Sequence, residues 1–166
     1  MSPKFVHLHL HSEYSLVDGL VRIPELISHC TLNGTAAIAL TDQSNVFGSS
    51  KFFRSAMSAG IKPIIGAELW VVDSENTGKP YKIVFLCQNN LGYKNLSVLL
   101  TRAYREGQHR GIPMVHEDWL TISQLTGIIC LSGGISGDIG LAFLAGNKER
   151  MLRSAAKWQD LIGERY

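Results

Sequence analysis

The 166-residue sequence lacks the features of several protein classes. No apolar run approaches the roughly 20 residues that span a bilayer, and histidines interrupt the apolar start of the chain, so neither a membrane helix nor a signal peptide is predicted. Charge of one sign is not pooled either, because 16 Lys and Arg residues against 14 Asp and Glu residues leave a net charge of +2. The clustered basic face of a dedicated nucleic-acid-binding domain is therefore not expected.

Cysteine is scarce, and its placement indicates a reducing compartment. Cys30, Cys87 and Cys130 are odd in number and each lies in an apolar stretch, which predicts buried free thiols. Apolar residues make up 45% of the chain and charged residues 18%, so a packed core is possible and extensive disorder is excluded. We expect a globular, cytoplasmic protein that does not bind membranes.

The chain alternates short apolar runs with longer amphipathic stretches, which predicts an α/β fold. Strands that are apolar nearly throughout are typical of a parallel sheet or barrel that is buried on both faces. The polar segment 73–80 predicts a hairpin loop, and segment 106–118, which has no clear period, predicts a longer loop. The predicted strands span residues 5–10, 36–40, 62–72, 82–87 and 127–131, and the predicted helices span 23–32, 49–59, 91–105, 136–144 and 148–162.

A run of alternating histidines is the strongest chemical signal. His7, His9 and His11 share one face of the first predicted strand, because successive side chains of a strand point to opposite faces. A single buried histidine is most often a core residue with a satisfied hydrogen bond. Three in strict alternation need a shared polar partner, which predicts a metal ion or a phosphate group.

Three carboxylates are predicted to lie near the same place. Asp18 follows the first predicted strand, Asp42 follows the second, and Glu68 lies inside the third. The carboxyl ends of parallel strands form one rim that carries the functional site. Mixed imidazole and carboxylate ligation suits Zn²⁺, Mn²⁺ or Fe²⁺ ions that activate water against a phosphodiester. For Asp18 and Asp42 a helix cap or a turn is the alternative.

Several longer motifs give the chain a family resemblance. The sequences HLHS at 9–12, TD at 41–42 and GIKPIIGAE at 60–68 resemble those of the PHP (polymerase and histidinol phosphatase) domain. FVHLHLHSEYSLVDG at 5–19, NLGYKNL at 90–96 and LSGGISGDIG at 131–140 are similar, more narrowly, to the N-terminal PHP domains of bacterial replicative DNA polymerase III alpha subunits.

This resemblance extends from about residue 5 to residue 166. It implies a distorted (β/α)7 barrel of PHP type, truncated here before its last strands. Residues 1–166 would then be a single PHP domain at the N-terminus of a much longer polymerase chain.

The resemblance also implies up to nine metal ligands, of which this chain keeps four: His9, His11, Asp18 and Glu68. Three positions differ from the family pattern, with Gln43 and Lys82 in place of histidines and Gly134 in place of a cysteine. A last Asp-x-His motif would lie beyond residue 166. Because each cation of such a site needs about three or four protein ligands, the loss predicts a degenerate site.

Lys82 is expected to act against metal binding, because its ammonium repels a divalent cation. We expect it to form an ion pair with an acid among Asp18, Asp42 and Glu68 and so to replace the metal as their counter-charge. A single residual zinc or manganese ion on His9, His11 and Glu68 is the alternative, since three such ligands can hold zinc.

Two functions follow from these expectations. The first is a structural and interaction role without a firmly bound metal or a catalytic residue, in which the domain packs against the polymerase core of its own chain. The resemblance implies that the full polypeptide is a DNA-directed DNA polymerase that uses Mg²⁺ and acts on DNA in chromosome replication, beside a proofreading exonuclease subunit and a sliding clamp.

The alternative function is an active metal-dependent phosphoesterase, either a 3′–5′ exonuclease or a pyrophosphatase. In that case His9, His11, Asp18 and Glu68 hold metal ions and His7 or Asp42 orients these ligands. Metal content distinguishes the two functions.

Overall fold

The computed structural model describes residues 5–16, 18–73 and 79–166. The chain divides into two compact units, the first ending at Ala67 and the second beginning at Glu68. The border lies inside strand β2 (Lys62–Val72), which therefore contributes residues to both units. Strand pairing through β2 joins the six strands of the described chain in one mixed sheet, accompanied by five α-helices.

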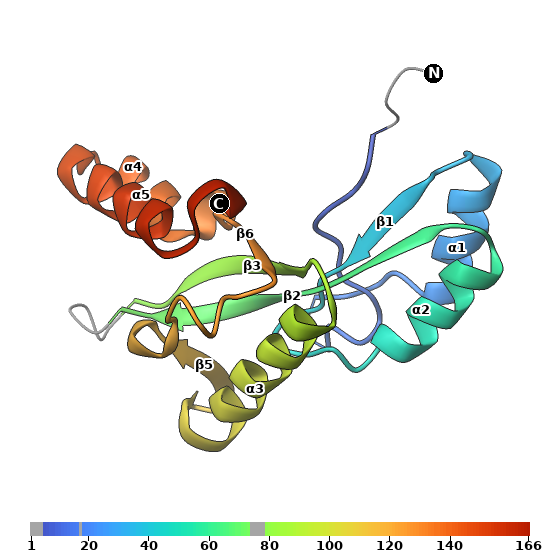
Figure 1. The fold of residues 1–166 in the computed structure, drawn as a ribbon, viewed down its shortest axis with the longest axis horizontal. Coiled ribbons are helices and arrows are strands. Elements are labelled where there is room, and N and C mark those ends of the chain that lie inside the picture. Colours follow the sequence, from blue (N-terminus) through green and yellow to red (C-terminus); the bar gives the residue numbers. More distant parts are fainter. Residues whose placement is uncertain (1–4, 17, 74–78) are drawn as a thin grey trace. The chain divides into compact units, whose positions relative to one another are not determined.

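The first unit contains α1 (Ile23–Leu32), β1 (Ala37–Leu40) and α2 (Ser49–Ser58). Figure 1 shows the two helices side by side, and β1 pairs in parallel with the first residues of β2, with Leu40 opposite Ile65. Pro24 occupies the first turn of α1, where its missing N–H leaves no bond unmade. The buried core of this unit comprises Ile23, Ile27, Cys30, Ile38, Leu40, Phe52, Ala56 and Ile61.

The predicted strand at 5–10 does not form. The segment runs beside β1, where the carbonyl of His7 accepts from the amide of Ala39 (2.9 Å) and the carbonyl of Leu10 from the amide of Thr41 (2.9 Å). The Thr41 hydroxyl oxygen accepts from the Leu10 amide at 2.8 Å and occupies the place of a ladder partner. An extended segment with an alternating sequence therefore lies here without a regular ladder, so the strand prediction is wrong.

The second unit orders its strands β4-β5-β2-β3-β6. Here β3 (Tyr81–Cys87) and β6 (Ile128–Leu131) are antiparallel, and β5 (Ile112–His116) is parallel to the end of β2. The prediction of a parallel sheet is thus correct only for β1, β2 and β5. A strand covered on both faces is apolar in either direction, so composition did not reveal the direction of β6.

The segment 106–118 is not the loop that the sequence predicts. It contains β4 (Gln108–His109), β5 and a short 3₁₀ turn, η1 (Glu117–Trp119). Arg110 and Gly111 form the two-residue turn between β4 and β5, with φ of 52° and 81°. This is the backbone of a tight hairpin turn, which most often contains Asn or Asp before Gly. Because Arg110 occupies the position where Asn or Asp is usual, the sequence did not predict the hairpin.

Three helices of the second unit follow the predicted periodicity. The side chain of Asn89 accepts from the amide of Gly92 at 3.0 Å and starts α3 (Asn90–Glu106). Helices α4 (Asp138–Leu144) and α5 (Lys148–Ile162) pack on each other, as Figure 1 shows. The predicted helix at 136–144 begins later, because Gly137 is extended and separates α4 from the 3₁₀ turn η2 (Gly134–Ser136). A last 3₁₀ turn, η3 (Gly163–Arg165), follows α5.

The architecture is therefore mixed α/β, and the closed (β/α)7 barrel stays a prediction. The expected hairpin loop at 73–80 lies largely outside the described residues. In the part of the chain that the structure covers, no helix is long and apolar enough to cross a membrane. Cys30 and Cys130 are buried and Cys87 is half-buried, and all three are free thiols, as predicted.

Candidate metal centre

Two of the three alternating histidines lie together in the first unit. The rings of His9 and His11 meet edge to face with centroids 5.0 Å apart. His7 is exposed, and its ring contacts that of Phe5 at 4.7 Å. The structure thus brings His9 and His11 together and places the ring of His7 against Phe5.

Asp18 lies beside His11. Its Oδ1 atom is 3.0 Å from Nδ1 of His11 and accepts from the hydroxyl of Ser15 at 2.8 Å. The Ser15 oxygen in turn accepts from the backbone amide of Gln43 at 3.0 Å. The carboxylate that the sequence assigned to a metal thus contacts an imidazole and a hydroxyl.

Asp42 is buried and holds the backbone that follows the histidines. Its Oδ1 accepts from the amide of Ser12 at 2.6 Å, and its Oδ2 accepts from the Ser12 hydroxyl at 2.9 Å. Burial is the largest influence on this carboxyl and raises its pKa, while the two hydrogen bonds from Ser12 oppose the rise. Asp42 therefore anchors the loop from which His11 and Asp18 project.

In the second unit, Glu68 and Lys82 form a close ion pair. Lys82 Nζ lies 2.6 Å from Glu68 Oε2, with side chains that are 19% and 4% exposed, and 5.0 Å from the centre of the Trp70 ring. Neighbouring strands β2 and β3 supply the three residues. The prediction that Lys82 reaches one of the acids is confirmed, and the acid is Glu68.

Gly134, in place of the family's cysteine, opens the turn η2. Its φ is +58°, a left-handed conformation that a cysteine would adopt with strain, although a Cβ added there would meet no atom within 4 Å. The preceding Gly133 approaches the carbonyl oxygen of Lys82 so closely that an added Cβ would lie 2.1 Å from it. This turn therefore packs directly on the backbone of Lys82.

Among the described residues, His9, His11 and Glu68 form a candidate metal-binding group. Two imidazole nitrogens and one carboxylate oxygen suit Zn²⁺, Mn²⁺ or Fe²⁺, so the donor set fits a single metal ion. The ammonium on Glu68 opposes it, because a cation already occupies the carboxylate. Asp18 is outside the group.

A second polar cluster was missed by the sequence analysis. Glu117 Oε1 accepts from Lys157 Nζ at 2.7 Å and from the hydroxyl of Tyr81. Asp138 Oδ2 lies 3.5 Å from the same ammonium and accepts from Trp158 Nε1 at 2.9 Å. Burial is the largest cause that raises the pKa of the Tyr81 hydroxyl far above its usual range, and the hydrogen bond to Glu117 raises it further. These contacts join α5 to β3, η1 and α4. The one signal in the sequence was Asp138, an acid at the start of a helix amid apolar residues.

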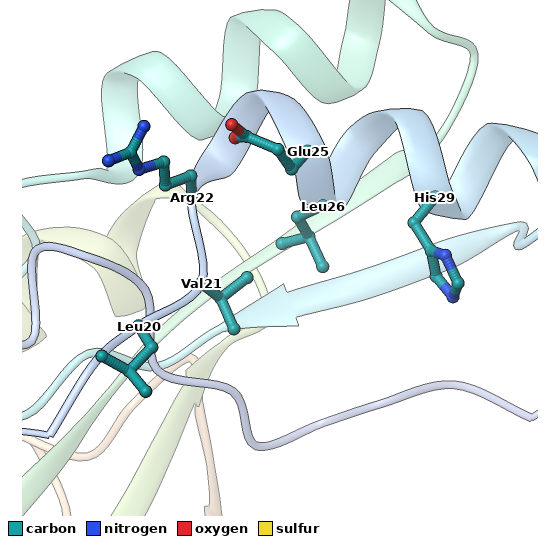
Figure 2. Close-up of a pocket in the computed structure, with 6 residues that line it drawn as sticks. All are labelled: Leu20, Val21, Arg22, Glu25, Leu26 and His29. Atoms are coloured by element: carbon teal, nitrogen blue, oxygen red, sulfur yellow. The ribbon is translucent and has the colours of Figure 1, made fainter.

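An open groove of about 540 Å³ lies beside α1. Figure 2 shows the residues that line it, three apolar and three polar side chains. None of the predicted metal ligands lines it. The lining residues are Leu20, Val21, Arg22, Glu25, Leu26 and His29.

The chain matches the family model of the PHP domain over residues 7–166. It is 41% identical over 166 residues to the DNA polymerase III subunit alpha of Pseudomonas fluorescens and 39% identical over 164 residues to that of Vibrio cholerae. The protein of the same name from Escherichia coli K12 is 38% identical over 164 residues. These matches cover 99–100% of this chain and 14% of each relative.

Two solved structures show weaker likeness. An amidohydrolase from Chromobacterium violaceum has a TM-score of 0.47 and 26% identity, over 59% of this chain and 32% of that one. A protein named as a metal-dependent phosphoesterase from Bifidobacterium adolescentis has a TM-score of 0.46 and 16% identity, over 99% of this chain and 58% of that one.

Proposed function

The chain belongs to the PHP domain family, and from this premise we propose that it is the PHP domain of a bacterial replicative DNA polymerase alpha subunit. Relatives at 38–41% identity that share this name support the assignment. The chain spans about one seventh of their length, so polymerisation of DNA belongs to the proposal for the whole polypeptide. Within that polypeptide, the domain acts as a structural and interaction module.

The ion pair between Lys82 and Glu68 is the observation that supports a structural role. A metal ion at Glu68 would need the carboxylate that Lys82 neutralises at 2.6 Å. The Lys82 ammonium supplies the positive charge that neutralises Glu68, so no metal ion is needed for that purpose. Gln43 and Gly134 offer no imidazole or thiolate where the family has them, so the set that could hold a cluster of ions is incomplete.

The partners of such a module follow from the same proposal. The polymerase core of the same polypeptide would pack against the domain, and the complete polymerase would use Mg²⁺, act on DNA and work with a proofreading exonuclease subunit and a sliding clamp. Its compartment would be the cytoplasm, where chromosome replication takes place.

A second function, metal-dependent phosphoester hydrolysis, is favoured by the donor set of His9, His11 and Glu68. These residues would hold one zinc or manganese ion, which would supply charge stabilisation and water activation for attack on a phosphoryl group. Asp18 and Asp42 would keep His11 and its loop in place. The positive charge of Lys82, which contacts Oε2 of Glu68, would oppose binding of the ion.

Metal content of the purified chain tests the two functions. The chain is saturated with ZnCl₂, exchanged into metal-free buffer and analysed by mass spectrometry, alongside the double variant His9→Ala/His11→Ala. The matched control is His7→Ala, which removes an exposed imidazole of the same segment that lies against Phe5.

The structural role predicts less than about a tenth of an equivalent of zinc in all three proteins, since ligands are missing. Stoichiometric zinc that is retained by the His7→Ala control and lost from the double variant would refute the degenerate site and support the phosphoesterase. Hydrolysis of a phosphodiester by the loaded chain would then be measured.

A further inference from the structure

We propose that the solvent-facing side of α3 is a docking site for an extended acidic peptide of a partner protein. The inference gives the proposed interaction module a partner surface, and it rests on that function for the biological purpose of the contact. The surface is a stripe along the helix, where an open groove of about 390 Å³ is lined by Lys94, Ser97, Val98, Thr101 and Arg105, among others.

Helix periodicity places these residues in one stripe. Lys94, Val98, Thr101 and Arg105 are four, three and four positions apart, and residues at such spacings share one face of an α-helix. All four are exposed, so the stripe faces solvent. The opposite side of α3 packs on β3 and β5 and carries the buried residues Leu96, Leu99, Leu100 and Ala103.

Two cations of the stripe are available to a partner. The neighbouring Arg102 donates to Glu106 at 2.8 Å and lies 4.0 Å from the centre of the Trp119 ring, so its charge is already matched. Within the described ranges, no acid pairs with Lys94 or Arg105. These two residues are eleven positions apart, which is about 16 Å along the helix axis. Carboxylates complement such cations across an interface.

Two hydroxyl groups between these cations distinguish a peptide from a nucleic acid. Ser97 donates its one hydroxyl proton to the carbonyl of Tyr93 at 2.8 Å, and Thr101 donates its own to the carbonyl of Ser97 at 2.8 Å. Each hydroxyl oxygen can then only accept a further hydrogen bond. The phosphate groups of a nucleic acid offer only acceptors, whereas a peptide backbone offers N–H donors. The hydroxyl groups therefore favour a peptide.

The spacing of the hydroxyl groups fits an extended backbone. Ser97 and Thr101 are four positions apart, which is about 6 Å along the axis. The N–H groups on one side of an extended chain recur at every second residue, or about every 6.6 Å. The interior N–H groups of a helical peptide are already bonded within the helix. Carboxylates about five residues apart in the extended chain would span the distance from Lys94 to Arg105.

The low apolar content of the stripe favours a separate partner over the rest of the same polypeptide. Among the described residues, Val98, which is 48% exposed, is the one apolar side chain that lines the groove. Permanent interfaces have apolar cores from which charged residues are depleted. Exposed charges instead speed the encounter of partners that bind reversibly. The stripe is therefore assigned to a peptide of another protein.

Fluorescence anisotropy with a defined peptide tests the proposal. The probe is a labelled peptide of sequence Glu-Glu-Ser-Val-Ser-Val-Glu-Glu with blocked ends. One control peptide has Gln in place of every Glu, and another has N-methyl groups on its central residues. The protein variants are Lys94→Gln, Arg105→Gln and Thr101→Val. Arg54→Gln is the matched control, because Arg54 is an exposed arginine of α2 outside the groove. Circular dichroism verifies that each variant is folded.

We expect the Glu peptide to bind, and added salt to weaken the binding. Lys94→Gln and Arg105→Gln should each lower the affinity about 3–5-fold, the upper part of the range for an exposed ion pair. The Gln peptide should bind about 10–25-fold more weakly, because both pairs are lost. Thr101→Val should lower the affinity about threefold through one lost hydrogen bond, and N-methylation should lower it about tenfold through two. Arg54→Gln should leave the affinity unchanged.

No binding of the Glu peptide at millimolar concentration, or binding that Lys94→Gln and Arg105→Gln leave unchanged, would overturn the proposal. Binding that N-methylation does not weaken would refute the extended backbone. Three other outcomes would each assign the stripe to a different occupant and so refute a separate peptide partner.

The first is an oligothymidylate that binds more tightly than the peptide and loses affinity in the same two variants, which would indicate a nucleic acid. The second is dimerisation of the chain, measured by sedimentation, that these variants abolish. The third is a full polypeptide that does not bind the peptide, because its own residues cover the stripe. The zinc analysis tests the proposed function independently, since no residue of the stripe belongs to the candidate metal-binding group.

Discussion

The ion pair between Lys82 and Glu68 predicts a measurable cost when its cation is removed. The two side chains are 19% and 4% exposed and their charged atoms lie 2.6 Å apart, so solvent screens the interaction little. Removal of one partner of a buried ion pair costs about 3–5 kcal/mol, because the other charge stays buried without it. Since Lys82 is partly exposed, we expect Lys82→Met to lower the free energy of unfolding by about 3 kcal/mol, at the lower end of that range.

The double variant Lys82→Met/Glu68→Gln should be more stable than Lys82→Met alone. In the double variant no buried carboxylate remains without its counter-charge, and replacement of a whole buried pair is often close to neutral. We expect a cost of about 1 kcal/mol relative to the unaltered chain, which implies coupling between the two positions.

Thermal unfolding measured in chelator provides the assay. For a chain of this size 1 kcal/mol corresponds to about 2–4 °C in Tm, so Lys82→Met should unfold about 6–12 °C earlier. Arg153→Met is the matched control, because Arg153 pairs with Glu149 at 2.9 Å on the surface, where the side chains are 67% and 84% exposed. Such pairs contribute at most about 1 kcal/mol. A Lys82→Met variant no less stable than the Arg153→Met control would refute the reasoning.

Three further predictions concern buried polar groups. Trp158→Phe removes the indole N–H that donates to the buried carboxylate of Asp138 at 2.9 Å. The free energy of unfolding in urea should fall by about 1–3 kcal/mol. A change below about 0.5 kcal/mol would contradict the role of this bond. Burial raises the pKa of Asp42 in the folded state, so its protonated form favours folding, and stability from this group increases as pH falls through the raised pKa. Asp42→Asn should therefore gain stability relative to the unaltered chain as pH rises from about 4 to 7; a difference that is constant across this range, measured by urea titrations, would show that Asp42 does not titrate differently on folding. Burial raises the pKa of the Cys87 thiol to about 11, so iodoacetamide at pH 8 should modify Cys87 slowly in the folded chain and rapidly in urea, and equal rates by mass spectrometry would be the contrary result.

Elements with a full apolar period were predictable from the sequence. The bounds of α1 and β2 agree with the prediction residue by residue. Pro24 and the left-handed Gly34 delimit the helix, and a run that is apolar apart from Lys62 and Glu68 delimits the strand. The extended segment 5–10 was mistaken for a strand because alternation records which side chains share a face and not whether a ladder forms. The hairpin at Arg110 escaped because its turn lacks the usual asparagine.

Three of the four residues that the sequence assigns to the site fall in the candidate group, and the contacts of the site were not predictable. His9, His11 and Glu68 were found from residue type and spacing, and Lys82 from the position it occupies in the motif. The contact of Asp18 with His11 depends on the turn that Ser15 and Gly19 close, which spacing alone does not specify. The cluster around Lys157 joins residues up to 76 positions apart, from Tyr81 to Lys157, each unremarkable in its own segment.

The glycines packed on the backbone of Lys82 limit how this position can change. Gly133 leaves no room behind the Lys82 carbonyl, and Gly137 approaches the same oxygen, so the main chain of β3 is held there whatever side chain it bears. An exchange of lysine for another residue would therefore alter the chemistry facing Glu68 without moving the scaffold. The side chain at position 82 thus determines which chemical group faces Glu68, on a backbone that the glycines hold in place.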